Sequence, residues 1–484
     1  MLRIKKIFLF SVVLLKLSNL FGQEQLGLRL ENYSGVSGIL LNPASNATSK
    51  LGWDVNIIGV GAFFGNDIGY IENATVGSAA NNAATIGPNP ELGYKSNIQA
   101  TLLLNAYKST NPKFVSTSVQ IMGPSFVINL ASGHSFGLFT QVRAMGGSHG
   151  LPRLANPYEY EKLKKGDVYD IDPFKISGMA WSEIGFNYGY RFGDESEGGL
   201  AFGVNVKYLN GFQAGYGNVL PGTRAQSVTG DSFRFELARI EAGFTTNYMD
   251  KNTVSKSNGS GFGIDIGAVM TIPGDEERPY EWRFGASVMD MGSVNFTQNA
   301  EVQQITLKEP FVFDKNDYQN LDPKDPRADA IQRFSQKAFG SPLATLKSKT
   351  FSMGLPSALQ VSADYSFTKN LFVNATLLQA LPVGETVLVR DNLLAVTPRF
   401  ESRWLSASLP ISLLNWGQMR MGLATRLAFL TIGTEDLLSL ISSSKLTGTD
   451  IYVALKVNPF RVGKLSGGNG GGRRRGGKVQ CYRF

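Results

Sequence analysis

The sequence predicts an all-β protein, a transmembrane antiparallel β-barrel of about 14 strands. Three observations predict it: an export signal, apolar and polar residues that alternate with period two, and connections of very unequal length. The chain has 484 residues and a mean hydropathy of −0.08, with no long apolar run after residue 22. A bundle of membrane-spanning helices is therefore excluded.

The first 22 residues have the three-part pattern of a signal peptide. Arg3, Lys5 and Lys6 precede an apolar stretch, 7–20, and Gly22 is a small residue at a plausible cleavage point. The stretch is too short to cross a membrane as a helix. We therefore expect export, and a mature chain that begins near residue 23.

The basic charge lies at the two ends of the chain. The net charge of +8 falls to −1 when the four basic residues of 1–22 and the five of 465–484 are left out. The body is therefore not a basic, nucleic-acid-binding surface. Residues 465–484 form a flexible Gly- and Arg-rich tail, interpreted as a disordered extension, with contact to an acidic partner as the alternative.

Alternation dominates residues 51–464, which we assign to the barrel. In 183–192 the apolar residues share one face, and glycine, amide and charged residues share the other. Such a glycine-rich polar face suits a crowded lumen better than the water-facing side of a secreted β-sandwich, which is the alternative. All five tryptophans fall near predicted strand ends, as in an interfacial girdle: Trp53, Trp181, Trp282, Trp404 and Trp416.

The alternation gives 15 candidate strands, one more than an even number allows, and the two that flank Gly123-Pro124 are candidates for one bent strand. Bulges are expected there and at Ile57-Ile58. The connections 148–174, 213–259 and 295–354 are expected to be long loops, the last with a short helix on Ile331, Phe334 and Ala338. The candidates are 52–64, 95–107, 113–122, 125–131, 135–147, 175–192, 198–212, 260–273, 281–294, 355–368, 370–381, 392–402, 403–413, 417–431 and 449–459.

Asn42, Pro43 and Ala44 lie between the signal and the first strand, and taken alone they indicate a turn. In this position the element resembles the N-terminal region of FadL-like outer-membrane barrels, which include the long-chain fatty-acid transporter and the PorV shuttle of type IX secretion. The whole mature chain resembles a poorly characterised family of Bacteroidota outer-membrane barrels, through LLNPASNA, GFGIDIGAV, VTPRFESRW, TIGTEDLLSL and TDIYVALKV. The resemblance implies that residues 23–50 form a segment that plugs the lumen.

Charged residues on the polar faces are candidates for a ladder inside the lumen, because Arg399 and Glu401, two apart on one strand, share a face. The ladder is interpreted as structural ion pairs, with a polar track or the seat of the plug as the functional alternative. Its members are Glu183, Arg191, Asp265, Arg283, Asp364, Arg399, Glu401, Arg420 and Arg426.

No catalytic or metal site is expected. Ser148 and His149 are adjacent on a strand and point to opposite faces, and no GxSxG occurs. The acidic cluster that begins at Asp314 matches no EF-hand and is interpreted as a solvated loop. With one cysteine, Cys481, and two histidines, disulfides, a cysteine-built zinc site and cofactors are not expected.

These observations predict a monomeric barrel in the cell outer membrane, surrounded by lipid, that is not an enzyme. Its expected function is to bind or pass a hydrophobic or amphipathic solute. The alternative is an accessory barrel whose long loops bind proteins of a secretion or cell-surface system. A soluble secreted adhesin is the third hypothesis.

Overall fold

The structure, a computed structural model, describes residues 24–458 apart from 93–99, 109–112, 157, 159–163, 165, 194–197, 230–231, 248–255, 276–277, 324 and 385. The predicted signal, 1–22, and the basic tail with Cys481 lie outside these residues. Most of the regular structure is β. Within the described ranges, every helix is too short or too polar to cross a membrane.

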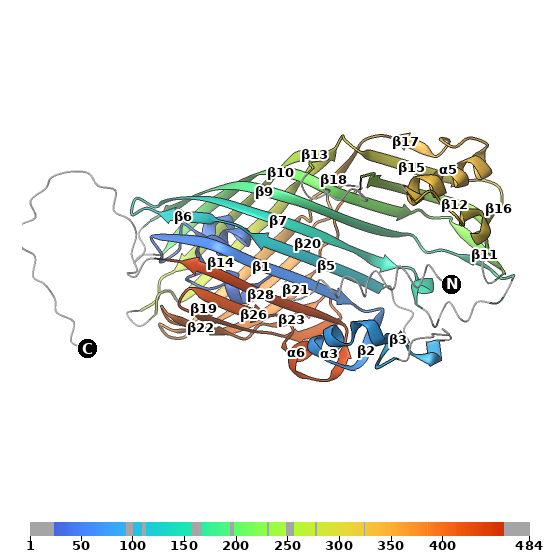
Figure 1. The fold of residues 1–484 in the computed structure, drawn as a ribbon. Helices are drawn as coiled ribbons and strands as arrows, with labels where there is room; N and C mark the ends of the chain where they lie inside the picture. Colours follow the sequence, from blue (N-terminus) through green and yellow to red (C-terminus); the bar gives the residue numbers. More distant parts are fainter. Residues whose placement is uncertain are drawn as a thin grey trace, which may run out of the picture.

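The wall is a closed antiparallel sheet of 14 strands (Figure 1). The first and last strands close it, pairing from Val55 with Val457 to Gly65 with Gly448. Some wall strands consist of two consecutive pieces. In order around the barrel the strands are β1 (Trp53–Asn66), β5 (Lys113–Met122) with β6 (Ser125–Asn129), β7 (His134–Leu151), β9 (Phe174–Phe192), β10 (Gly199–Val219), β13 (Gly259–Ile272), β14 (Trp282–Phe296), β18 (Phe351–Gly354) with β19 (Ala358–Ser366), β20 (Leu371–Ala380), β21 (Leu393–Glu401), β22 (Leu405–Ser408) with β23 (Ile411–Leu414), β24 (Gln418–Met421) with β25 (Leu423–Leu427), β26 (Leu430–Thr434) and β28 (Gly448–Val457).

The two faces of the wall differ as the alternation predicts. Ile184 and Phe202 point outward and are 55% and 47% exposed, whereas Asn187 and Asn205, on the same strands, point inward and are fully buried. Closure satisfies every strand edge within the sheet, and an apolar outer face then suits hydrocarbon. The fold is therefore a transmembrane β-barrel.

The connections differ in length between the two ends of the barrel. Short turns such as 130–133, 367–370 and 402–404 lie at the end where β1 begins and β28 finishes. We call this the short-turn end, and the other the long-connection end. The unequal connections were predicted correctly.

The prediction that 213–259 and 295–354 are loops was wrong. At the long-connection end the wall continues beyond the barrel, through β8 (Val168–Asp170), β11 (Arg224–Thr229), β12 (Ser232–Thr245), β15 (Ala300–Leu307), β16 (Phe311–Asp314) and β17 (Leu346–Ser348). Charged residues on both faces of these strands obscure the alternation. The predicted helix is confirmed as α5 (Pro326–Phe339), which begins at the capping Asp325 and ends at Gly340.

The predicted wall strand 95–107 was also wrong. Its described part contains β4 (Leu102–Ala106), which joins β2 (Gly69–Ala74), β3 (Ile86–Pro88) and β27 (Ser444–Leu446) in a separate small sheet. Three consecutive leucines, all half-buried, place apolar side chains on both faces of β4, so the period of two is lost. The remaining short helices lie in the connections or before β1: α2 (Leu26–Arg29), η1 (Gly35–Leu40), η2 (Pro43–Ser45), α3 (Val76–Asn81), η3 (Ala83–Thr85), η4 (Pro90–Leu92), η5 (Arg153–Ala155), η7 (Lys315–Tyr318) and α6 (Leu437–Ile441).

The predicted number of 14 strands is correct because one strand predicted wrongly, 95–107, is offset by one strand that was missed, β26. β5 and β6 form one strand bent at Gly123-Pro124, as expected, and the region predicted as one strand at 417–431 turns at Ala428 and also contains the start of β26. The expected bulge at Ile57 is confirmed. One aromatic assignment was wrong: Trp181 lies in the middle of β9, points inward and is fully buried.

The outer face can be tested with Val206→Arg. Val206 lies on β10 and is 49% exposed. An arginine near the middle of a bilayer destabilises a barrel by roughly 2–4 kcal/mol, so the urea midpoint of the barrel in lipid vesicles should fall accordingly. Phe339→Arg, on the exposed end of α5 outside the wall, is the control and should change it little. Equal effects of the two variants would show that this face does not meet lipid.

Candidate functional site

Residues 24–50, which we call the inner segment, fill the lumen of the barrel. In Figure 1 this dark blue stretch lies behind the strands of the wall. Almost all of its residues are buried, among them Leu26, Val36 and Ile39, each fully. The backbone–backbone hydrogen bonds of the segment all close within the segment, so in the described chain the wall holds it through side chains.

Asn42, Pro43 and Ala44 make a turn and also hold the segment to the wall. The side-chain oxygen of Asn42 accepts from the Ala44 amide at 3.0 Å, and Pro43 starts the single turn η2. The side-chain nitrogen of Asn42 donates to the carbonyls of Ala268 (3.1 Å) and Ala286 (3.3 Å) on β13 and β14. Asn42 therefore closes the turn that the sequence indicates and also joins this turn to two strands of the wall.

Inward-facing glycines leave room for this turn. A Cβ on Gly203 of β10 would lie 2.3 Å from the Pro43 carbonyl carbon, and one on Gly267 of β13 would lie 2.2 Å from the Asn42 side-chain oxygen. The backbone of the segment thus approaches the wall at distances that only glycine permits. The glycines on the polar faces of the strands therefore have a specific role: Gly203 and Gly267, which we call the glycine floor, leave the space that Asn42 and Pro43 occupy.

Asparagines of the wall bind the carbonyls of the segment. Asn187 donates to the carbonyl of Pro43 at 3.0 Å, and Asn205 donates to that of Ile39 at 2.9 Å. Asn205 also donates to Asp265 at 2.9 Å, which links the seat to the charged groups deeper in the lumen. Buried backbone acceptors need such partners, because an unpaired buried carbonyl costs free energy comparable to a lost hydrogen bond.

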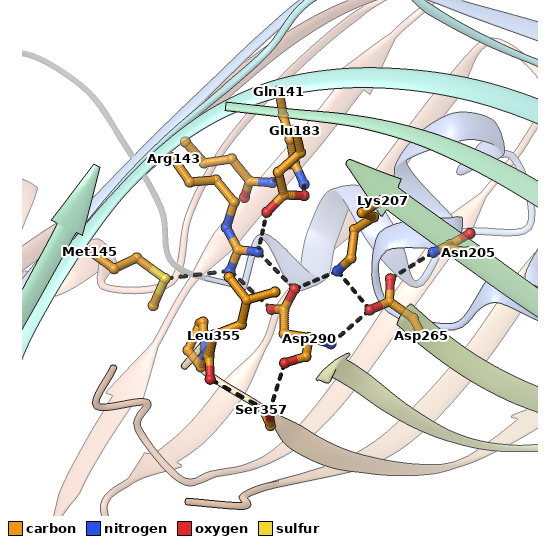
Figure 2. Close-up of polar contacts among 12 residues, drawn as sticks. Gln141, Arg143, Met145, Glu183, Asn205, Lys207, Asp265, Asp290, Leu355 and Ser357 are labelled. Atoms are coloured by element: carbon orange, nitrogen blue, oxygen red, sulfur yellow. Dashed lines mark hydrogen bonds and ion pairs between the residues drawn. The ribbon is translucent and has the colours of Figure 1, made fainter. Parts of the chain in front are cut away.

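A buried ion network, which we call the central network, lies beyond Asn205 (Figure 2). Arg143 and Lys207 converge on the carboxylate of Asp290 at 2.9 and 2.6 Å, and Lys207 also binds Asp265 at 2.7 Å. Glu183 accepts from Arg143 at 3.1 Å. Each charge has at least one opposite partner, which a charge excluded from water requires.

The inner segment takes part in this network. Arg390, from the connection between β20 and β21, binds Asp290 at 3.1 Å and binds both carboxylate oxygens of Glu24 at 2.9 and 3.0 Å. The start of the segment is therefore held in mid-lumen, by a residue that belongs to the long-connection end.

A second group of charges lies nearer the short-turn end. Arg399 binds Asp364 through two nitrogens, at 2.8 and 2.6 Å, and also binds Glu401. Arg283 joins Asp364 at 3.0 Å and donates to the Asn32 side chain at 2.8 Å. Glu401 in turn accepts from both nitrogens of Asn32 at 3.0 Å, so these wall residues also bind the segment.

The structure does not bring all predicted ladder residues together. Glu183 and Asp265 belong to the central network, whereas Arg283, Asp364, Arg399 and Glu401 belong to the second group. Arg426 binds Glu31 of the segment at 2.7 Å. Arg191 is half-buried near the short-turn end, and Arg420 donates to Gln418.

Several site residues were missed from the sequence. Arg143 and Lys207 are in phase with the inward faces of their strands, so the alternation signals them. Asp290 is out of phase, because β14 bulges there with a positive φ of 56°. Glu24 and Arg390 lie outside regular strands and carry no periodic signal.

An apolar cluster occupies the lumen above the central network, toward the long-connection end. Trp181, Leu209 and Phe296 point inward and are fully buried there, together with Leu388 two residues before Arg390. The polar lumen expected from the sequence therefore applies only to the part nearer the short-turn end.

Ser148 and His149 bind different partners. The Ser148 hydroxyl donates to the carbonyl of Lys175, and His149 pairs with Asp391 at 2.9 Å. The two side chains thus do not form a nucleophile–base pair, as their adjacent positions predicted. Among the described residues, no group of His, Cys, Asp and Glu is arranged to hold a metal.

Comparison with known proteins gives one family match and several distant structures. The model of a family of unknown function (DUF5723) matches residues 43–435. No curated protein matches. Similar solved structures include the toluene transporters TodX of Pseudomonas putida (10% identity, 88% of this chain and 93% of that chain, TM-score 0.40) and TbuX of Ralstonia pickettii (10%, 88% and 93%, TM-score 0.37).

The glycine floor predicts that Gly203→Ala loosens the inner segment. The added methyl group meets backbone of residues 43 and 44, which cannot rotate away. Overpacking of this kind costs roughly 1–3 kcal/mol, so exposure of the segment should rise by about tenfold or more. The reporter is the rate of maleimide labelling of Ala47→Cys, which is buried in the segment, in a Cys481→Ser background.

Gly215→Ala, on the same strand, is the control. Its added Cβ would have ordinary contacts of 3.6 Å, so labelling should stay at the rate of the parent protein. If both glycine variants label at the parent rate, the close approach of segment and wall is not what holds residues 43 and 44.

Because Asp290 joins three cations of the central network, Asp290→Asn is expected to destabilise the barrel strongly. Asparagine keeps the shape and tolerates the positive φ, but it leaves Arg143, Lys207 and Arg390 without their shared carboxylate. Loss of one partner of a buried pair costs roughly 3–5 kcal/mol, seen as a lower urea midpoint. Asp329→Asn breaks an exposed pair with Arg333 and should cost at most about 1 kcal/mol. Similar midpoints for the two variants would contradict a network held by charge.

Proposed function

The chain belongs to the DUF5723 family, whose function is unknown, and we propose that it is an outer-membrane barrel that passes a solute when the inner segment moves. The wall supplies a closed polar and apolar lumen across the membrane. The segment supplies the gate. This proposal includes the location in the outer membrane, for which the apolar outer face and the export signal are the support.

One observation carries the proposal: the segment that fills the lumen is not part of its wall. Residues 24–50 form no β-ladder with any described strand, and the hydrogen bonds that join them to the described wall involve a side chain of the segment or of the wall. A segment held in this way can leave without breaking the sheet that closes the barrel. A segment that served only as core would be expected to extend the wall or to pack on one side of it.

The lining changes along the lumen, which favours an amphipathic solute over a purely hydrophobic one. The apolar cluster around Trp181 and Phe296 lies toward the long-connection end. The central network and the second group, with Asp290 and Asp364, lie between it and the short-turn end. A solute that enters the lumen from the long-connection end meets apolar side chains first and charged ones afterwards.

An accessory role in a protein-secretion or cell-surface system is the second candidate. One feature favours it: the long-connection end carries a folded extension of strands and α5 in place of flexible loops. Such a surface could bind a partner protein without any opening of the lumen. None of the comparisons supports this role.

The gate can be tested by locking the segment to the wall. A Cβ built on Gly189 of β9 lies 3.3 Å from the Cβ of Ala47, close to the separation within a disulfide. In a Cys481→Ser background, the pair Gly189→Cys and Ala47→Cys should abolish uptake of a dansyl-labelled undecanoate by intact cells when oxidised. Reduction should restore it.

A second pair joins two wall strands and serves as the control. Gly59→Cys on β1 and Ala454→Cys on β28 are 3.7 Å apart by the same measure, and their disulfide leaves the segment free. Uptake should then be the same in oxidised and reduced cells. Uptake that continues with the segment locked would rule out gating by the segment, and partner proteins that co-purify in stoichiometric amount would then favour the accessory role.

A further inference from the structure

Three small polar cavities lie beside the inner segment. Their volumes are about 10, 20 and 60 Å³. The largest lies toward the short-turn end, against Arg283 and Asp364, and the 20 Å³ cavity lies in the central network, against Lys207 and Asp290. The space needed for one water is about 10–15 Å³ by this measure, so each can hold water.

Arg29 of the segment lines all three cavities. Of the described residues around them, it is the one shared by the three. Its side chain is buried, 5% exposed, and forms part of the lining of each cavity. A single side chain thus borders both the cavity beside the second group and the cavity in the central network.

Arg29 is also held less firmly than Arg143 and Arg399, two other buried arginines of the lumen. It makes one hydrogen bond, to Gln120 at 2.7 Å, and its ion pair with Glu24 is long, at 3.7 Å. Its Nε has no hydrogen-bond partner among the described groups. Arg143 and Arg399, by contrast, each bind two carboxylates at short range. The side chain that the three cavities share therefore has fewer short ion pairs to break when it moves than Arg143 or Arg399 has.

We propose that Arg29 is the seal that closes the polar route past the seated segment, so that water and small uncharged polar solutes are excluded while the segment stays in place. The inference rests on the proposed function, because a gated barrel needs such a seal in its closed state. It assigns Arg29 a role in selectivity that is separate from the release of the whole segment.

The chemistry of the route sets the class of solute. Its lining combines hydroxyl, amide and charged groups, such as Ser118, Gln141 and Arg143 in the 20 Å³ cavity. Small solutes with hydrogen-bonding groups match this lining, whereas apolar ones would leave its polar groups unpaired.

Two substitutions of Arg29 separate the volume of the side chain from its bonds. Arg29→Ala and Arg29→Met both remove the bonds to Gln120 and Glu24, but only alanine also removes the volume, since methionine is unbranched, flexible and nearly as long. The reporter is Ser118→Cys, buried in the 20 Å³ cavity, in the Cys481→Ser background. The probe is methyl methanethiosulfonate, a small uncharged thiol reagent, added to the purified barrel in lipid vesicles.

With Arg29→Ala, the reaction rate of Ser118→Cys should rise by about tenfold or more, because the buried thiol becomes accessible through the joined cavities. With Arg29→Met it should stay near the parent rate. Ala47→Cys, the reporter of the seated segment, should react slowly in both. Lys337→Ala, far from the lumen on α5, should change neither reporter.

Three results would overturn the inference. Ser118→Cys could remain unreactive with Arg29→Ala, it could react equally with Arg29→Ala and Arg29→Met, or Ala47→Cys could become reactive in step with it. The last two would mean that lost bonds, rather than lost volume, open the lumen. The disulfide between positions 47 and 189 tests the proposed function separately. If this disulfide fails to block uptake, gating by the segment is wrong. If it blocks uptake but Ser118→Cys stays unreactive with Arg29→Ala, only the role of Arg29 as a seal is wrong.

Discussion

Arg390 and Arg426 are buried inside the closed barrel, and each binds a carboxylate of the inner segment, Glu24 and Glu31 respectively, with Arg390 also binding Asp290 of the wall. Two charges taken out of water gain stability from each other only when both are present and well placed. The wall and the segment are therefore electrostatically incomplete alone. The segment's position, the central network and the filled state of the lumen all depend on this mutual neutralisation.

The wall holds the inner segment through two kinds of contact, which have different consequences. Around Asn42 and Pro43 the contacts are uncharged and very close, and the bare backbone of Gly203 and Gly267 sets their geometry. Around Glu24 and Glu31 they are ionic, which makes them strong in a dry lumen and sensitive to the entry of water. Hydration of the lumen would thus weaken the ion pairs of Glu24 and Glu31 first and leave the close contacts of Asn42 and Pro43 in place.

Much of the wall follows from period-two alternation, because burying one face against a lumen and the other against lipid imposes it on each strand. In 183–192 it placed the polar residues, Glu183 and Asn187 among them, together on the face that the structure turns inward. It failed where the backbone leaves the regular pleat. Counted from Trp282, alternation places Asp290 on the lipid side, and only the bulge with its positive φ turns that carboxylate inward.

The location of the inner segment came from a resemblance, and its contacts could not have been predicted. Its residues carry no strand or helix period, and the pairs that matter join positions hundreds of residues apart, as Glu24 with Arg390. Nor does the sequence indicate that the lumen becomes apolar at Trp181 and Phe296. Which residues suit the inward face of a barrel depends on what occupies the lumen. Here the lumen is occupied by a segment and side chains that lie far apart in the sequence.

The seam between the first and last strands is bridged from within. The Val36 amide donates to Asp54 on β1 at 2.9 Å, and Lys456 on β28 donates to the carbonyl of Ser34, two residues away, at 2.7 Å. Together these bonds tie both strands of the seam to neighbouring residues of the segment. Filling of the lumen and closure of the barrel therefore stabilise each other, because the segment adds side-chain bonds to a seam that otherwise consists of the β1–β28 ladder.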